Sequence, residues 1–237
     1  MQRLAVAVLT YDRPKWLEEV LRDLHASDLP VGWVRDVTLV DNSEAVESKR
    51  AVDGYLEHGL FDRLIRPQYN VGIAPGWNLA WSVANAEDAF AAVGLPDVFV
   101  LVQDDVSLDP GWFVDCLEAL DTFPDLPLVT GYNSPCHETL ERRTTPSGVR
   151  VHVQPHLPGV HLMGRREFWE GIFPLRTPLH HAQEDWEISK DSSGAPTQNG
   201  KLCACVPGLV VHHGGKESTW NPKEHVEYVD PIAETMP

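Results

Sequence analysis

The sequence is poor in cysteine and contains no paired-cysteine motif. Its four cysteines, Cys116, Cys136, Cys203 and Cys205, form no CxxC pair, which disfavours a zinc ribbon or a thioredoxin-like redox motif. Cys203 and Cys205 would point to the same side of a strand, where we expect them to pack in the core. This cysteine usage predicts a protein of the reducing cytoplasm.

Long apolar runs are also missing. The apolar stretch at residues 4–9 is too short for the hydrophobic region of a signal peptide, and no other run approaches the length of a membrane span. We therefore expect a cytoplasmic protein without a membrane span.

Positive charge is scarce. The chain has 19 Lys and Arg against 35 Asp and Glu, which gives a formal net charge of −16. Because phosphate backbones bind to local positive charge, this balance disfavours a nucleic-acid or anionic-membrane surface without excluding it. A small phosphorylated ligand held through a metal ion stays compatible with it.

Glycine-rich phosphate-binding loops are absent. No GxGxxG or GxxxxGK[ST] pattern follows a predicted strand, which disfavours a dinucleotide-binding site and a P-loop. A sugar nucleotidyltransferase would need a glycine-rich, basic loop after its first strand, and residues 10–14 do not supply one. No linker or internal repeat divides the chain, so we expect one domain.

The most informative stretch that is present is residues 98–106. An apolar run at 98–102 predicts a strand buried on both faces, and Gln103-Asp104-Asp105 follows where it should end. In an open α/β sheet, ligands bind beyond the carboxyl ends of the strands, so these two carboxylates are placed to hold a divalent cation. The alternative for an isolated Asp-Asp pair is a turn cap and a solvated side chain.

Strands and helices alternate through the first half. Asp12 is expected to cap a helix that has Pro14 in its first turn and an apolar stripe at Leu17, Val20, Leu21 and Leu24. Asp109 and Pro110 are expected to begin another helix in the same way. Short connections predict a parallel sheet. The predicted strands are 4–10, 37–40, 61–65 and 98–102. The intervening helices are the one that Asp12 caps, a polar helix at 45–58, and a long helix that follows residues 70–78 and ends at about 92.

The second half is less regular. We expect a helix at 165–170 and another that opens at 184, with loops at 135–148, 175–183 and 192–200. The tail from 221 to 237 has no predicted structure. The predicted strands are 128–130, 149–153, 159–163, 202–206 and 209–211.

Six short motifs occur in the order found in one enzyme family. They are 8–14 with the following helix, 39–43, 70–78 with its Asn70, Gly72, Gly76 and Asn78, the DXD-type 103–105, Glu184-Asp185, and His212. Over residues 3–218 the chain thus resembles the glycosyltransferases of family 2. The resemblance implies a GT-A fold: an α/β, Rossmann-like domain at 1–220 with a mostly parallel central sheet flanked by helices. Its nucleotide-binding half would be about 1–110 and its acceptor half about 111–220.

The resemblance also implies the donor site. Thr10 and Asp41 would contact the base and ribose of a UDP- or dTDP-sugar, and an ionised Asp41 could accept from a pyrimidine imide N–H. The alternative role for Asp41 is a turn residue before Asn42 and Ser43. The donor-binding residues implied are Thr10, Tyr11, Asp41, Asn70, Gly72, Asn78 and Asp104.

Metal and base are implied in the same way. Asp105 would bind Mn²⁺ or Mg²⁺ bridging the two phosphates, and His212 would complete the site, although His213 is an alternative because adjacent strand residues face opposite ways. Asp185 would be the general base of an inverting transfer to a hydroxyl acceptor, with Glu184 supporting it. If this resemblance does not extend to function, both acids are ordinary first-turn helix residues.

Two other functions remain open at this stage. One is a phage-type transferase that acts on modified DNA bases, for which Arg142, Arg143 and Arg150 could form a local basic patch. The other is a non-catalytic module that binds a nucleotide-sugar. The sequence does not specify the donor sugar or the acceptor.

Overall fold

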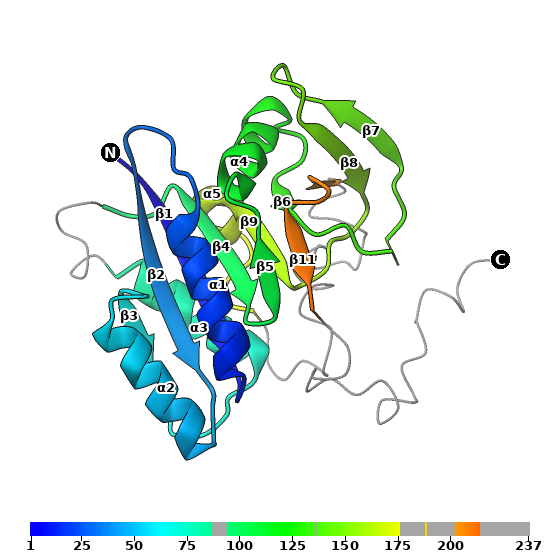
Figure 1. Cartoon of the computed structure of the whole chain (residues 1–237). Helices are drawn as coiled ribbons and strands as arrows, with labels where there is room; N and C mark the ends of the chain where they lie inside the picture. Colours follow the sequence, from blue (N-terminus) through cyan, green and yellow to red (C-terminus); the bar gives the residue numbers. More distant parts are fainter. Residues whose placement is uncertain (87–93, 136, 176–187, 189–201, 214–237) are drawn as a thin grey trace.

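Parallel strands alternate with helices in the first half of the protein, as the sequence predicts (Figure 1). The computed structural model describes residues 1–86, 94–135, 137–175, 188 and 202–213. β1 pairs in parallel with β2 and β4, and β2 pairs in parallel with β3, where the strands are β1 (Gln2–Thr10), β2 (Trp33–Asp41), β3 (Arg63–Ile65) and β4 (Val98–Gln103). The helices between them are α1 (Pro14–Ala26), α2 (Val46–Glu57) and α3 (Ile73–Ala84).

Antiparallel strands extend the sheet in the second half. β9 pairs antiparallel with β4 and β6, β10 joins β6 to β8, and β7 forms the edge. The order in the described sheet is β3-β2-β1-β4-β9-β6-β10-β8-β7. The added strands are β6 (Leu128–Thr130), β7 (Glu141–Thr144), β8 (Arg150–Gln154), β9 (His161–Arg165) and β10 (Cys203–Cys205).

A small second sheet lies beside this one. β5 (Val106–Leu108) pairs antiparallel with β11 (Val210–His212), and Figure 1 shows β11 in orange next to β5 in green. Two further helices complete the described elements, α4 (Trp112–Thr122) and α5 (Arg166–Glu170). The strand β5 follows directly after Asp105, so this pairing brings the end of β11 to the two carboxylates.

Apolar side chains fill both faces of the large sheet. The α1 stripe of Leu17, Val20, Leu21 and Leu24 is fully buried on one face, as its spacing predicts. On the other face, α3 buries Trp77 among alanines. The sheet is therefore covered on both faces, which explains why β1 and β4 are apolar along nearly their whole length. Cys203 and Cys205 are buried in the core with free thiols, as expected.

Two predicted helix caps are wrong. Arg13, not Asp12, is the N-cap residue of α1, and the Asp12 carboxylate instead accepts hydrogen bonds from the backbone N–H groups of Glu44 and Ala45. Gly111 is the N-cap residue of α4, while Asp109 closes the preceding turn by accepting from the Gly111 N–H. In both places the acid satisfies loop backbone instead of the first turn of its helix.

One helix end and two strands also differ from the predictions. Helix α3 ends at Ala84 with Asn85 as its C-cap residue, well before the expected 92. The predicted loop 135–148 contains the strand β7, whose exposed polar residues carry no apolar alternation. The three-residue strand β5 was not predicted. The predicted loops at 175–183 and 192–200, the helix that opens at 184 and the tail 221–237 fall, apart from Leu175 and Ile188, outside the described residues.

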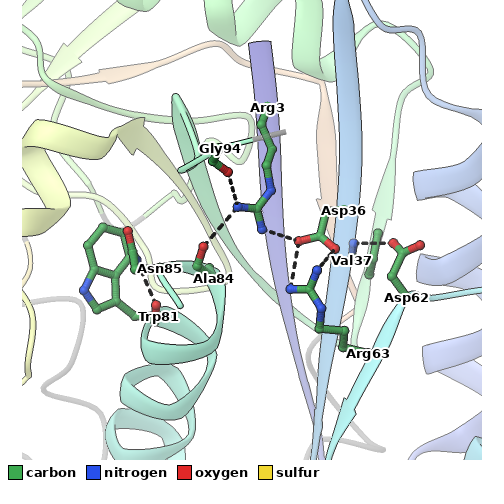
Figure 2. Close-up of polar contacts among 9 residues, drawn as sticks. All are labelled: Arg3, Asp36, Val37, Asp62, Arg63, Trp81, Ala84, Asn85 and Gly94. Atoms are coloured by element: carbon green, nitrogen blue, oxygen red, sulfur yellow. Dashed lines mark hydrogen bonds and ion pairs between the residues drawn. The ribbon is translucent and has the colours of Figure 1, made fainter. Parts of the chain in front are cut away.

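A buried arginine holds the amino-terminal end of the sheet together (Figure 2). The guanidinium of Arg3 is fully buried and donates to Asp36 at 2.7 Å and to the carbonyl oxygens of Ala84 and Gly94, both at 3.0 Å. Arg63 forms an ion pair with the same Asp36 at 3.0 Å. This cluster connects β1, β2 and β3 with the C-terminal end of α3, at the end of the strands opposite to Thr10.

None of the helices in the described ranges combines the length and the apolarity that crossing a membrane requires.

Candidate active site

The carboxyl ends of β1, β2 and β4 meet at one edge of the sheet. Thr10 lies opposite Asp41 in the β1–β2 register, and Leu9 lies opposite Gln103 in the β1–β4 register. Asp104 and Asp105 follow Gln103 directly and are both 4% exposed. The structure therefore brings together the polar residues that end these three strands.

Asp104 is fixed by the turn that follows β1. Its Oδ2 accepts hydrogen bonds from the Thr10 hydroxyl at 2.6 Å and from the Tyr11 N–H at 3.2 Å. Burial raises the pKa of Asp104 to about 6, although the positive charge of Arg13 and the Thr10 hydrogen bond act in the opposite direction. Both donors point at one oxygen, so this carboxylate has a fixed orientation at the edge of the sheet.

An arginine and a histidine both approach the same oxygen of Asp105. Nη1 of Arg13 lies 2.5 Å from its Oδ2, and Nε2 of His212 lies 3.4 Å from that atom. Burial alone would raise the pKa of Asp105, but the hydrogen bond with His212 and the charge of Arg13 outweigh it and lower the pKa. The other oxygen, Oδ1, is buried and has no hydrogen-bond partner among the described residues.

The pairing of β11 with β5 decides which histidine faces the carboxylates. His212 lies opposite Val106 in the register, and its ring faces Asp105. His213 turns to the other side, where its Nε2 lies 2.6 Å from the Ser107 hydroxyl and its ring stacks on Trp16 with centroids 4.6 Å apart. Of the two candidates, His212 is therefore the one in position to share a ligand with Asp105.

Asp41 is held from two sides. Its Oδ1 accepts from the Ser43 N–H at 3.0 Å, which is the turn role considered for it, and its Oδ2 accepts from Nε of Arg66 at 2.8 Å. Arg66 also pairs with Asp53 at 2.9 Å. The side chain of Asp41 is fully buried, and its ion pair with Arg66 balances its charge there.

The loop before α3 packs against the turn after β2. The Asn42 amide donates to the Gly72 carbonyl oxygen at 3.2 Å, and the exposed Asn70 accepts from the Gly72 N–H at 2.9 Å. Gly72 has a φ of 81°, a conformation that favours glycine. Asn78 faces elsewhere: its amide donates to and accepts from the backbone of Leu175, at 2.9 and 2.7 Å.

Glu184 and Asp185, the predicted base and its support, lie outside the described residues. Two arginines for which the sequence predicts no role lie in the site, Arg13 beside Asp105 and Arg66 beside Asp41. For Arg13, the only available signal was its position immediately after a strand-end turn. For Arg66 it was its position one residue after the predicted strand 61–65, at the edge where Asp41 also ends a strand.

The arrangement fits a divalent ion held jointly with a ligand. Asp105 and His212 could supply two neighbouring ligand atoms, and Oδ1 of Asp105 accepts no hydrogen bond within the described residues. Among the described residues, no group of three or more His, Cys, Asp or Glu side chains could hold a metal ion. An ion here would need further oxygen ligands, as in sites where Mg²⁺ is bound by one or two carboxylates and substrate phosphates.

Comparison with solved structures identifies the fold as that of the GT-A glycosyltransferases. A mannosyltransferase, PcManGT from Pyrobaculum calidifontis, in complex with GDP-Man and Mn²⁺, superposes with a TM-score of 0.65 at 19% identity, over 91% of this chain and 58% of that one. GalNAc-T7 with UDP, GalNAc and Mn²⁺ gives 0.62 at 12% identity, over 89% of this chain and 44% of that one.

A third neighbour is S. aureus TarS 1-349 in complex with UDP-GlcNAc, with a TM-score of 0.57 at 16% identity, over 94% of this chain and 63% of that one. The chain thus spans less than two thirds of the length of each of these proteins. No protein-family model matches the sequence, and no curated protein matches it. The predicted GT-A fold is confirmed, and the finer assignment to family 2 stays a prediction.

Proposed function

We propose that this protein is a metal-dependent, inverting glycosyltransferase that transfers a sugar from a UDP- or dTDP-sugar to a hydroxyl acceptor. The observation that carries the proposal is the meeting of Asp104, Asp105 and His212 at the carboxyl ends of the central strands. This is the edge at which open α/β sheets bind their ligands. Neighbours with the same fold were solved with nucleotide-sugars or Mn²⁺, which supports this class of substrate.

Donor binding is assigned to the strand ends. The base and ribose would lie across Thr10, Asp41 and Asp104, with Tyr11 and the 70–72 loop at their borders. Because both oxygens of Asp41 already accept hydrogen bonds, a base N–H would have to share one of them with Ser43 or Arg66. Asn78 contributes indirectly in this proposal, by holding Leu175 just before the segment that carries Glu184 and Asp185.

Asp105 and His212 would hold Mn²⁺ or Mg²⁺. When bound, such an ion neutralises the charge that develops on a departing diphosphate. The chain's own contribution is to fix the two ligand atoms through the β5–β11 pairing and through the hydrogen bond from the His213 N–H to the Asp105 carbonyl oxygen, 2.8 Å long. Asp185 is proposed to remove the acceptor proton, with Glu184 beside it. The buried free thiols agree with the cytoplasmic location that we propose.

The test is release of nucleoside diphosphate from a panel of UDP-, dTDP- and GDP-sugars with Mn²⁺, Mg²⁺ or chelator, followed by an acceptor screen. We expect turnover with a UDP- or dTDP-sugar that needs metal and is lost in Asp105→Ala. The matched control is Asp121→Ala, an exposed acid of α4 that should behave as wild type. The anomeric configuration of the product, read by NMR, tests inversion. Turnover that is unaffected by chelator would contradict the metal-dependent reading.

For the DNA-modifying alternative, one arginine of the suggested basic patch already has acidic partners. Arg143, central to the suggested basic patch, pairs with Asp125 at 2.6 Å and with Glu141 at 3.0 Å. Its charge is therefore balanced locally, and the net charge of the chain stays at −16.

A gel shift with duplex DNA at micromolar protein and physiological salt should show no complex, since we expect a dissociation constant for non-specific binding on the order of 10⁻⁴ M or weaker. Donor binding without any turnover would favour the non-catalytic module.

A further inference from the structure

The chain supplies its own cation to the Asp104-Asp105 pair. Nη1 of Arg13 lies 2.5 Å from Oδ2 of Asp105 and 3.3 Å from Oδ1 of Asp104. The side chains of both acids are nearly buried, at 5 and 6% exposed, and that of Arg13 is 14% exposed. Two neighbouring carboxylates removed from water repel each other strongly, so a positive charge between them stabilises their ionised forms. Arg13 provides that charge in the protein alone.

The position of Arg13 is set by the turn before α1. Asp12 adopts a φ of 54°, in the left-handed region that most residues other than glycine avoid. Its carboxylate accepts from the N–H groups of Glu44 and Ala45, and its own N–H donates to the Ser43 hydroxyl at 3.1 Å. These three bonds tie the turn after β1 to the turn after β2. They hold the strained residue that directs Arg13 toward the carboxylates.

Arg13 and His212 both contact the same atom, Oδ2 of Asp105. An ion ligated by both Asp105 and His212 would need this atom or would lie very close to it. A guanidinium hydrogen-bonded to that atom and a divalent ion repel each other at such short range. The ion can therefore bind well only if the guanidinium leaves Oδ2.

We propose that Arg13 is an intramolecular competitor of the divalent ion at Asp105, and that it is drawn away when a nucleoside diphosphate binds. This inference rests on the proposed function, because it takes the diphosphate as the ligand. The guanidinium of arginine binds phosphate oxygens as well as carboxylates, so a bound diphosphate can become its new partner. The same diphosphate can supply further oxygen ligands to the ion. Metal and nucleotide binding are then coupled, each raising the affinity for the other.

The experiment measures Mn²⁺ binding directly, from the electron paramagnetic resonance signal of free Mn²⁺, without nucleotide and with UDP. We expect Arg13→Gln to bind Mn²⁺ without nucleotide about 5–150-fold more tightly than wild type, the usual range for coupling between two ligands. With UDP, this advantage should shrink or reverse. In wild type, UDP should raise the affinity for Mn²⁺, and in Arg13→Gln it should raise it less.

Two controls accompany the variant. Arg22→Gln removes an exposed arginine of α1 whose ion pair, within the part of the chain that the structure describes, is with Glu18 of the same helix, and this variant should bind Mn²⁺ as wild type does. Arg13→Lys keeps the charge and should stay close to wild type without nucleotide. If Arg13→Gln fails to fold, as judged by its circular dichroism melt, Arg13→Met and the lysine variant carry the same comparison.

The inference is overturned if the neutral variants bind Mn²⁺ without nucleotide no better than wild type, which is what a purely structural role predicts. Absence of Mn²⁺ binding in every protein, with and without UDP, overturns it together with the metal site. If the neutral variants bind Mn²⁺ more tightly but no sugar is transferred from any donor, the competition stands and the glycosyltransferase proposal fails.

Discussion

Thr10 donates the hydrogen bond of its hydroxyl to Oδ2 of Asp104 over 2.6 Å, and this bond joins the last residue of β1 to the first residue after β4. Both side chains are buried, and the two positions are 94 residues apart in the sequence. The bond fixes the distance between two strand ends that we propose bind the donor. It therefore contributes both to the stability of the fold and to the shape of the proposed site.

Replacing Thr10 by valine should lower the free energy of unfolding by about 1.5–3 kcal/mol, the range for a hydrogen bond to a charged group. Valine has nearly the shape of threonine but cannot donate, which leaves Asp104 with fewer partners. Urea denaturation at pH 7.5 measures the change. Thr10→Ser keeps the donor and should cost only about 1 kcal/mol for the lost methyl group. Strict additivity of Thr10→Val with Asp104→Ala, which removes the acceptor, in a double-mutant cycle would show that the bond contributes nothing.

Gly131 leaves no room for a side chain beside β11. A Cβ at this position would lie 2.6 Å from Cγ2 of Val210 and 3.0 Å from Cβ of Leu209, so Gly131→Ala must displace the start of the strand that ends in His212. We expect a loss of about 1–3 kcal/mol of stability, as for other overpacked sites, and weaker Mn²⁺ binding in the presence of UDP.

The matched control for Gly131→Ala is Gly54→Ala in α2, where nothing lies within 4 Å of the added carbon. This substitution should stabilise the protein by about 0.5–1 kcal/mol, because alanine is favoured over glycine inside a helix. Thermal melts and Mn²⁺ titrations of both variants provide the comparison. An alanine at 131 that leaves both quantities at wild-type values would show that β11 is free to shift.

His161 makes the fold sensitive to acid. Burial lowers its pKa from the ordinary 6.5 to about 3, and its Nδ1 accepts a hydrogen bond from the Gly131 N–H. Between these two values the unfolded chain binds a proton that the native state does not, so this contribution to stability is present above pH 6.5 and is lost as the pH falls toward 3. From pH 7 to pH 5 the loss is about 2 kcal/mol.

The variant His161→Asn keeps an acceptor for the Gly131 N–H but cannot take up a proton. It should be less stable than wild type at pH 7, because a smaller side chain leaves space beside Trp112. It should nevertheless lose less stability than wild type when the pH falls from 7 to 5, as measured by urea denaturation. His25→Asn, at an exposed position of α1, should lose as much as wild type. Equal losses in all three proteins would remove His161 from the acid response.

Asp185 provides the sharpest test of the mechanism. If it is the general base, Asp185→Asn should keep metal-dependent UDP binding but lower transfer by about 10²–10⁴-fold. If it is only a residue at the start of a helix, asparagine caps nearly as well as aspartate and turnover should barely change. Steady-state rates with the best donor and acceptor decide between the two. A variant that keeps more than about a tenth of wild-type turnover excludes the catalytic role.

The helices and strands that were predicted correctly from the sequence are those whose own residues show a clear hydrophobic pattern. The run in β4 and the period of Leu17, Val20, Leu21 and Leu24 specify burial locally, and the parallel order of β1 to β4 follows from strand–helix alternation. By contrast, β7 is an exposed edge strand that exists because β8 lies beside it, and β5 has three residues that pair with β11 about 100 positions later. Such strands form because of tertiary pairing, and their own residues show no pattern from which they could be predicted.

The candidate site, too, has parts that the sequence predicts and parts that depend on tertiary contacts. The gathering of Thr10, Asp41 and Asp104 follows from the rule that parallel strands deliver their ends to one edge. The contacts of Arg13 and Arg66 do not, because a long side chain in a turn can reach many partners and its choice depends on register and on the strained backbone at Asp12. The choice between His212 and His213 likewise needed the register of β11.

The buried Arg3 cluster has a consequence for redesign. Arg3 and Thr10 are seven residues apart on β1, a separation of about 23 Å along an extended strand. That distance is well beyond the roughly 7–10 Å past which substitutions without shared partners usually stop interacting. Charge substitutions among Asp41, Asp104 and Asp105 should therefore add to, and not interact with, substitutions around Arg3. The proposed donor site can therefore be varied at one end of these strands without disturbing the Arg3 ion-pair cluster at the other end.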